Sequence, residues 1–183
     1  MRPPTQILKS CASLVLALLG CAWQTAALAQ PQAPESELKA AIIANMLLFV
    51  EWPSGNKSTS EQLTLCYLDN SPVSESLALL HGKTIKGKSL DVVQSSPEKL
   101  GNCHALYLSP SNGSTLARIA NGSLGNLPVL LIGDTPGFLR RGIMVNLEQV
   151  SGRIIFDIDL GALQASRLKL SSKALRLARQ VVE

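Results

Sequence analysis

The sequence predicts an α/β fold, a three-layer sandwich with a mostly parallel sheet, helices on both faces and a C-terminal antiparallel hairpin. β-Prone segments alternate with helix-like segments between residues 63 and 132, the order expected of parallel strands joined by helices. Residues 129–132 are Val-Leu-Leu-Ile, a continuously apolar run typical of a strand buried on both faces. Two later strand-like segments, 142–147 and 153–158, are joined by a short connection with hairpin spacing.

The first predicted helix covers residues 35–51. Ser36 is a possible N-cap, and Pro53 ends the helix after Trp52 because proline disfavours helical backbone in the residue before it. Apolar residues recur in this segment at spacings of three and four, namely Leu38, Ile42, Ile43, Met46, Leu47 and Val50. We therefore expect one face of this helix to be buried.

The remaining elements follow from the same patterns. The predicted order is a strand at 63–68, a helix at 72–80, a strand at 89–93, a strand at 103–108, a helix through Leu116 and Ile119, and the strand at 129–132. After the hairpin, Asp159 is placed to cap a short helix through Ala165. A last helix is predicted over 171–182, with Leu175 and Ala178 facing inward.

Residues 1–29 have the features of a signal peptide. Arg2 and Lys9 give a basic start, residues 11–23 form an apolar run too short to span a bilayer, and Ala27-Leu28-Ala29 matches a signal-peptidase site. We expect export to the periplasm, a flexible lead-in at 30–36 and one domain at 37–183. A less favoured alternative is a lipobox that would leave Cys21 acylated and the protein tethered to a membrane.

The charge of the chain argues against nucleic-acid binding. The leader contains two of the 17 basic residues and none of the 13 acidic residues, so 15 basic and 13 acidic residues remain after cleavage. No cluster of Lys and Arg interleaved with aromatic residues is present in the remainder. The basic residues between 167 and 179 are interpreted as a solvated helix face.

Two cysteines remain after removal of the leader, Cys66 and Cys103. Two thiols in one small domain usually pair in an oxidising compartment, so we predict a disulfide. A zinc site that also uses His81 and His104 is the weaker alternative, because the spacings match no common zinc motif.

The sequence offers few groups for catalysis. It contains no G-x-S-x-G, Walker, G-x-G-x-x-G or H-E-x-x-H motif. Asp157 and Asp159 are interpreted as an edge residue and a helix cap rather than as a pair of catalytic carboxylates. We therefore predict a binding or regulatory module with no catalytic residue, metal or cofactor.

Six segments resemble the YfiR family of exported regulators from Gram-negative bacteria. They are ELKAAIIANMLLFVEWP at 37–53, LTLC at 63–66, NCHALYLS at 102–109, GIMVNLE at 142–148, GRIIFDID at 152–159 and LKLSSKALRLAR at 168–179. The helix ending in FVEWP and the LKLSSKALRLA run are the most specific of these. The chain departs from the family at Asp159, where asparagine is frequent, and in lacking the second cysteine pair of some members.

This resemblance implies a location, a function and partners. A YfiR-type protein lies in the periplasm and represses an inner-membrane diguanylate cyclase, YfiN, by binding its periplasmic sensory region. An outer-membrane lipoprotein, YfiB, relieves this repression, so the output is cyclic-di-GMP and biofilm behaviour. The resemblance further implies that Cys66 and Cys103 form a structural bridge and that the protein is a homodimer.

Two sets of residues are candidates for the functional site. Phe138, expected to be exposed after the Pro136-Gly137 turn, and Glu148 and Arg153 of the hairpin are candidates for partner binding. For Phe138, the alternative that its ring folds back over the sheet stays open.

A hypothesis of a different class is a periplasmic small-ligand sensor that acts on another membrane receptor. Its pocket would lie at the carboxyl ends of the parallel strands, near Ser109, Asn112 and Asp134.

Overall fold

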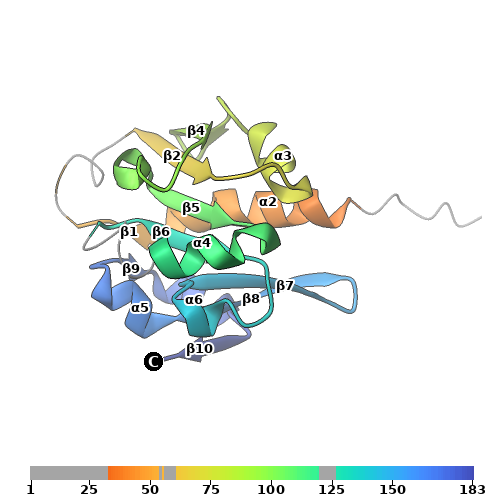
Figure 1. The fold of residues 1–183 in the computed structure, drawn as a ribbon, viewed down its shortest axis with the longest axis vertical. Helices are drawn as coiled ribbons and strands as arrows, with labels where there is room; N and C mark the ends of the chain where they lie inside the picture. The colour runs from red at the N-terminus through yellow and green to blue at the C-terminus, as the bar shows by residue number, and fades with distance from the viewer. Residues whose placement is uncertain (1–32, 54, 56–60, 120–126) are drawn as a thin grey trace, which may run out of the picture. The chain divides into compact units, whose positions relative to one another are not determined.

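The structure is a computed structural model that describes residues 33–183 apart from residues 54, 56–60 and 120–126 (Figure 1). The predicted signal peptide at 1–29 and residues 30–32 lie outside the described residues. The lead-in was expected to extend to residue 36, but residues 35 and 36 already belong to the first described helix.

The main sheet has eight strands in the order β10-β8-β7-β6-β5-β2-β4-β3. Five central strands, β7, β6, β5, β2 and β4, are parallel neighbours, while β3 is antiparallel to β4, and β8 is antiparallel to β7. The strands are β2 (Gln62–Tyr67), β3 (Thr84–Ile85), β4 (Lys88–Gln94), β5 (Ala105–Leu108), β6 (Leu130–Gly133), β7 (Val145–Val150), β8 (Arg153–Asp159) and β10 (Gln180–Val182). The mostly parallel sheet and the C-terminal hairpin are therefore as predicted.

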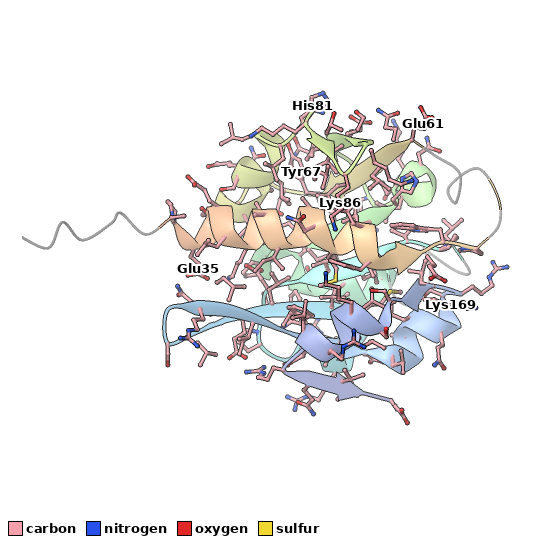
Figure 2. All side chains as sticks on the ribbon, turned by 180° about the vertical axis from the view of Figure 1, so that it is seen from behind. Glu35, Glu61, Tyr67, His81, Lys86 and Lys169 are labelled. Atoms are coloured by element: carbon pink, nitrogen blue, oxygen red, sulfur yellow. A yellow bond between two sulfur atoms is a disulfide. The ribbon has the colours of Figure 1, made fainter. Side chains whose placement is uncertain are left out.

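Helices lie on both faces of this sheet. The α-helices are α2 (Glu35–Met46), α3 (Pro72–Ala78), α4 (Gly113–Arg118), α5 (Leu160–Ala165) and α6 (Ser172–Leu177). Figure 1 shows α4 in front of the sheet, and Figure 2, seen from behind, shows α2 in front of it. Helix α3 packs against α2. The predicted three-layer α/β sandwich is confirmed.

The order in which successive strands are added to the sheet changes direction between the parallel neighbours β2 and β5, and this point is called here the reversal. The connection from β2 through α3 leads to β4 on one side, whereas the connection from β5 through α4 leads to β6 on the other side. Because crossovers between parallel strands are right-handed, these opposite directions place α3 and α4 on opposite faces. Ligands of open α/β sheets bind beyond the carboxyl ends of the strands at such a reversal.

Strands β5 and β6 form the centre of the hydrophobic core. All four residues of each strand are buried, which agrees with the continuously apolar pattern of β6. Their large apolar side chains, such as Leu106, Leu108 and Ile132, are completely inaccessible to solvent. Complete burial of one such side chain contributes roughly 1.5–3 kcal/mol.

The predicted disulfide is present between Cys66 in β2 and Cys103 just before β5. The two Cα atoms are 5.8 Å apart, and the cysteines are 37 residues apart in sequence. Strands β2 and β5 are hydrogen-bonded neighbours in the sheet, which explains why the two thiols meet. The covalent bond therefore links the two strands on either side of the reversal.

The prediction that the first helix extends to residue 51 is wrong. Helix α2 ends at Met46, a 3₁₀ turn η2 (Leu47–Phe49) follows, and β1 (Val50–Glu51) pairs antiparallel with β9 (Lys169–Leu170). Helix periodicity persists beyond Met46, but pairing with a distant segment overrides it. Ser36 is not the N-cap either, because Pro34 occupies that position and Ser36 lies inside the helix.

The prediction of a last helix over 171–182 is also wrong. Helix α6 ends at Leu177, and β10 pairs in parallel with β8, with Val181 opposite Ile158. The consecutive valines near the C-terminus favour a strand once the edge of β8 is available. Ala174 is the buried residue of α6, while Leu175 and Ala178 are half-buried. The capping role of Asp159 is confirmed, since its Oδ1 accepts the Ala162 backbone N–H at 2.8 Å.

Candidate functional site

A hydrogen-bonded cluster lies at the carboxyl ends of β2 and β5, where the chain reverses across the sheet. The Ser109 hydroxyl lies 2.8 Å from Asp69 Oδ1 and 2.9 Å from Asp69 Oδ2, and the Ser111 hydroxyl donates to the same carboxylate. Asn112 Oδ1 accepts the backbone N–H of Ser109 at 3.0 Å within the 3₁₀ turn η4 (Pro110–Asn112). These bonds hold the loop after β5 against the loop after β2.

A pocket of 420 Å³, called here the carboxyl-end pocket, opens beside this cluster. Its polar lining comes from Glu35, Ser36 and Lys39 of α2, from Ser71 at the start of α3, and from Tyr107 and Asp134 at the ends of β5 and β6. Of the three residues predicted to form a pocket here, Asp134 lines it. Ser109 and Asn112 are buried beside it and are engaged in the hydrogen bonds of the loop.

Lys39 is a buried cation between two carboxylates. Its Nζ lies 2.6 Å from Glu35 Oε1 and 3.0 Å from Asp134 Oδ2. Burial lowers the pKa of Lys39, but the hydrogen bonds and charges of the two carboxylates outweigh that effect and raise it above the ordinary 10.5. Lys39 is therefore charged at neutral pH and connects α2 to the end of β6.

Tyr107 and Asp134 bring two buried polar side chains to the same place. The side chain of Asp134 is 7% exposed and Tyr107 is 1% exposed. The Tyr107 hydroxyl interacts with the side chains of Ser71 and Asp134. Burial, and then the negative charge of Asp134, raise the pKa of Tyr107, so its phenol is protonated at neutral pH.

Sequence reasoning missed Lys39, Asp69 and Tyr107 as members of this site. Lys39 follows Glu35 by four residues, and this spacing alone indicates an ordinary pair on a helix surface. Tyr107 lies in an otherwise apolar strand and is most simply interpreted as a core residue. The signal that was available is the position of Asp69, Ser109 and Asp134 immediately after three strand-like segments.

A second feature is an apolar groove of 300 Å³ between α2 and α6, called here the α2–α6 groove. Its lining includes Leu38, Ile42, Phe49, Phe156, Ala174 and Leu177. Leu177 is 63% exposed, which is unusual for a large apolar side chain beside other apolar residues. Leu38 and Ile42, predicted to be buried in the core, are half-buried and line this groove.

Two lysines lie beside the α2–α6 groove. Lys86 Nζ is 5.2 Å and Lys173 Nζ is 5.9 Å from the centre of the Phe49 ring. Both lysines are exposed, and Figure 2 shows Lys86 on the same side of the molecule as α2. The groove is therefore apolar at its base and positively charged at this end.

The expectation that Phe138 is exposed is wrong. Phe138 is 3% exposed and belongs to the hydrophobic core. A Cβ atom placed on Gly133 would lie 3.0 Å from Phe138 Cδ2, and the Arg141 guanidinium lies 5.3 Å from the ring centre. The turn at Pro136 and Gly137 directs the ring back over the end of β6, which was the alternative left open by the sequence.

The two hairpin candidates for partner binding differ in their surroundings. Glu148 in β7 binds Arg179 Nη2 at 2.7 Å, and Arg179 also donates from Nε to Asp157 Oδ1 at 2.8 Å. The hydrogen bonds of Asp157, and then of Glu148, raise the pKa of Arg179. Arg153 is exposed beside the hairpin turn, opposite Val150. In the hairpin register Glu148 lies opposite Ile155, two positions further from the turn than the Val150–Arg153 pair.

Over the described ranges, no three His, Cys, Asp or Glu side chains gather as they would around a metal ion. Within the same residues, none of the helices has both the length and the apolar character needed to cross a bilayer.

A match to a known protein family extends over most of the chain. The sequence pattern of the family described as YfiR/HmsC-like matches residues 36–179, a span that includes the groove and all of the pocket lining except Glu35. The chain belongs to the YfiR/HmsC-like family. Members of this family are regulatory rather than catalytic domains.

A solved structure with a TM-score above 0.5 supports the fold. A conserved domain protein from Vibrio cholerae O1 biovar El Tor is similar with a TM-score of 0.53 and 14% identity. The ABC domain from Streptococcus pneumoniae, solved in complex with L-Trp, has a TM-score of 0.48 and 9% identity. In both comparisons the match covers 80% of this chain, which spans 60% of the length of the other chain. None of the curated proteins matches the sequence.

Proposed function

We propose that this YfiR/HmsC-like protein is a periplasmic repressor of an inner-membrane diguanylate cyclase. It binds the periplasmic sensory region of a YfiN-like cyclase and lowers cyclic-di-GMP, and a YfiB-like outer-membrane lipoprotein relieves the repression. Family membership supports this proposal. The Cys66–Cys103 disulfide agrees with it, because such bonds persist in an oxidising compartment such as the periplasm.

The α2–α6 groove is the surface that fits this function best. Leu177 and Phe49 provide an apolar base, and Lys86 and Lys173 provide positive charge at one end. An amphipathic helix binds such a groove through its apolar face. The proposed occupant is a helix of the receptor's periplasmic region with apolar residues along one face and acidic residues beside them.

Repression then needs only a difference in affinity. A protein that binds the inactive receptor more tightly than the active receptor shifts the population toward inactivity. A shift from 99% active to 99% inactive requires a preference of about 5.5 kcal/mol. A few buried apolar anchors supply energies of that order at protein interfaces, whereas exposed charge pairs contribute little.

The experiment compares two exposed leucines in cells that contain the candidate cyclase. Deletion of the gene should raise cyclic-di-GMP, and Leu177→Asp should reproduce the deletion because it places a charge in the α2–α6 groove. Leu79→Asp is the matched control, since Leu79 is 71% exposed and does not line the groove. Both variants should keep the wild-type melting temperature.

Three results are informative. Raised cyclic-di-GMP for Leu177→Asp alone supports docking in the groove. Equal effects of the two substitutions would reject the groove as the docking surface. Unchanged cyclic-di-GMP in a clean deletion would reject the repressor function itself. The homodimer implied by the family is a separate proposal, and light scattering after size exclusion would measure it.

A second candidate function is a small-ligand sensor that acts on another membrane receptor. The carboxyl-end pocket favours it, because the buried side chains of Tyr107 and Asp134 bring polar groups to the lining of a 420 Å³ pocket. A thermal-shift screen against metabolites tests this function. A reproducible stabilisation that is lost when the pocket is blocked supports it.

A further inference from the structure

We propose that the α2–α6 groove also binds a single-chain anionic amphiphile, a free fatty acid. The acyl chain lies along the apolar groove, and the carboxylate lies between the ammonium groups of Lys86 and Lys173. Binding of this ligand does not depend on the repressor function. The same groove is the proposed docking surface, so ligand and receptor helix exclude each other, and this consequence rests on the proposed function.

The lining of the groove suits a hydrocarbon chain because it offers almost no hydrogen-bonding group. Among the described residues that line it, only Asn45 is polar, and its Nδ2 already donates to the Ala41 carbonyl at 2.8 Å. A sugar would leave its hydroxyl groups without partners against such a wall. A methylene chain loses no hydrogen bond on entering the groove, and each methylene that is fully buried strengthens binding by about fourfold.

The groove is long enough for an acyl chain of medium length. Leu38 and Met46 line it from the same helix, about 12 Å apart along the helix axis at about 1.5 Å per residue. Phe49 continues the apolar lining beyond Met46. Leu177 lines the groove from α6 and is 63% exposed, so a chain that covers it removes apolar surface from water.

Two ammonium groups converge on one end of the groove. Lys86 Nζ lies 5.2 Å and Lys173 Nζ lies 5.9 Å from the centre of the Phe49 ring. Among the described residues, neither ammonium forms an ion pair with a carboxylate. Two positive charges on one ring repel each other, and an anion between them is attracted to both.

The backbone of Lys86 supports a role for its side chain. Lys86 has a φ of 47° and Gly87 a φ of 83°, so both central residues of the turn between Ile85 and Lys88 are left-handed. Asparagine, aspartate or glycine is usual at the first of these positions, because other side chains are strained there. Anion binding by the ammonium group accounts for a lysine at this strained position.

The charges at the two ends of α2 determine the direction of the ligand. Glu35 and Glu37 lie in the first turn of the helix, so the end of the groove near Leu38 disfavours an anion. Lys86 and Lys173 lie at the Phe49 end. The carboxylate of the ligand therefore lies at the Phe49 end, and its methyl end points toward Leu38.

The probe is dodecanoate, with dodecyltrimethylammonium as a cation that has the same chain, both used below their micelle-forming concentrations. Titration calorimetry on the exported, disulfide-bonded protein should show at least tenfold tighter binding of dodecanoate. Octanoate should bind at least tenfold more weakly than dodecanoate, because fewer methylene groups are buried.

Charge variants test the position of the carboxylate. Lys86→Gln combined with Lys173→Gln should reduce dodecanoate binding at least tenfold. Lys99→Gln combined with Arg118→Gln removes the same charge and should leave binding unchanged, because both side chains are exposed and do not line the groove. Equal affinity for dodecanoate and the cation, or an equal loss in the two double variants, would overturn the carboxylate site.

A blocking variant tests the position of the chain. Ala41→Glu places a carboxylate in the groove from an exposed position of α2, where glutamate favours the helix, and it should abolish dodecanoate binding. Ala78→Glu is the matched control, because Ala78 is an exposed helix residue outside the groove lining. Absence of dodecanoate binding to the wild type, or binding that Ala41→Glu leaves intact, would overturn the amphiphile site.

A competition measurement separates this proposal from the repressor function. Dodecanoate should displace the receptor's periplasmic region from the wild-type protein. If dodecanoate binds but the receptor region does not, the repressor function fails and the amphiphile site stands. If both bind at the same time, mutual exclusion in the groove is overturned.

Discussion

Removal of the Cys66–Cys103 disulfide should destabilise the protein substantially. The bond closes a loop with a sequence separation of 37 residues. In the chain-entropy account, a cross-link of this length reduces the entropy of the unfolded chain enough to stabilise the native state by about 4 kcal/mol. A small domain has a total stability of about 5–15 kcal/mol, so this loss is a large fraction of the whole.

The double variant Cys66→Ala and Cys103→Ala is the cleanest perturbation. Both cysteines are buried, and alanine places no polar group or free thiol in the core. Urea unfolding followed by circular dichroism should show a loss of about 2–5 kcal/mol in the free energy of unfolding. Wild-type protein treated with dithiothreitol should show a similar loss, whereas the double variant should not respond to the reductant.

Three results would refute this reasoning. A loss below about 1 kcal/mol would mean that the bond does not restrict the unfolded chain as the entropy account requires. Free thiols in protein purified from the periplasm without reductant would mean that the bond does not form there. Loss of receptor binding in a double variant that remains folded would mean that the bond acts in recognition rather than in stability.

Two further predictions concern single side chains. Phe138→Ala should lower the free energy of unfolding by about 3–5 kcal/mol, because the ring is buried against the end of β6, and an unchanged urea midpoint would contradict that burial. Lys39→Met should destabilise the protein at neutral pH because it leaves Asp134 buried without its ammonium partner. The raised pKa of Lys39 means that its contribution is complete below the ordinary value of 10.5 and is lost as the pH rises through the higher folded-state value. The stability difference between wild type and Lys39→Met should therefore shrink only above about pH 10.5, and a difference that disappears near pH 8 would show that the ion pairs are not its source.

Several elements could be predicted because their signals are local. The run at 129–132 is apolar on both sides, and β6 is buried on both faces. The two strands around Gly152 have hairpin spacing, and β7 and β8 pair antiparallel. The helix predicted at 72–80 begins at Pro72 after a Ser71 cap. In each case the pattern and its structural cause lie within a few residues of each other.

The candidate site was predicted only in part. Strand ends in a parallel sheet meet at one edge, and of the three residues predicted for a pocket there, Ser109, Asn112 and Asp134, only Asp134 lines it. Lys39 reaches the same place from a helix 95 residues away in sequence from Asp134. No spacing in the sequence indicates that contact, because it depends on how α2 lies across the sheet.

The amino-acid sequence by itself determined the α/β class, the order of the central strands along the chain and the pairing of the only two cysteines beyond the predicted leader. These properties depend on local periodicity and on composition. The tertiary structure decided where α2 and α6 end, that Phe138 is buried, and that Leu177 is left exposed beside other apolar side chains. The sequence shows that a side chain is apolar, but whether it is buried depends on which distant segment covers it. Pairing of Val50 with Leu170, or of Val181 with Ile158, stabilises a strand only when the fold has brought the two segments together.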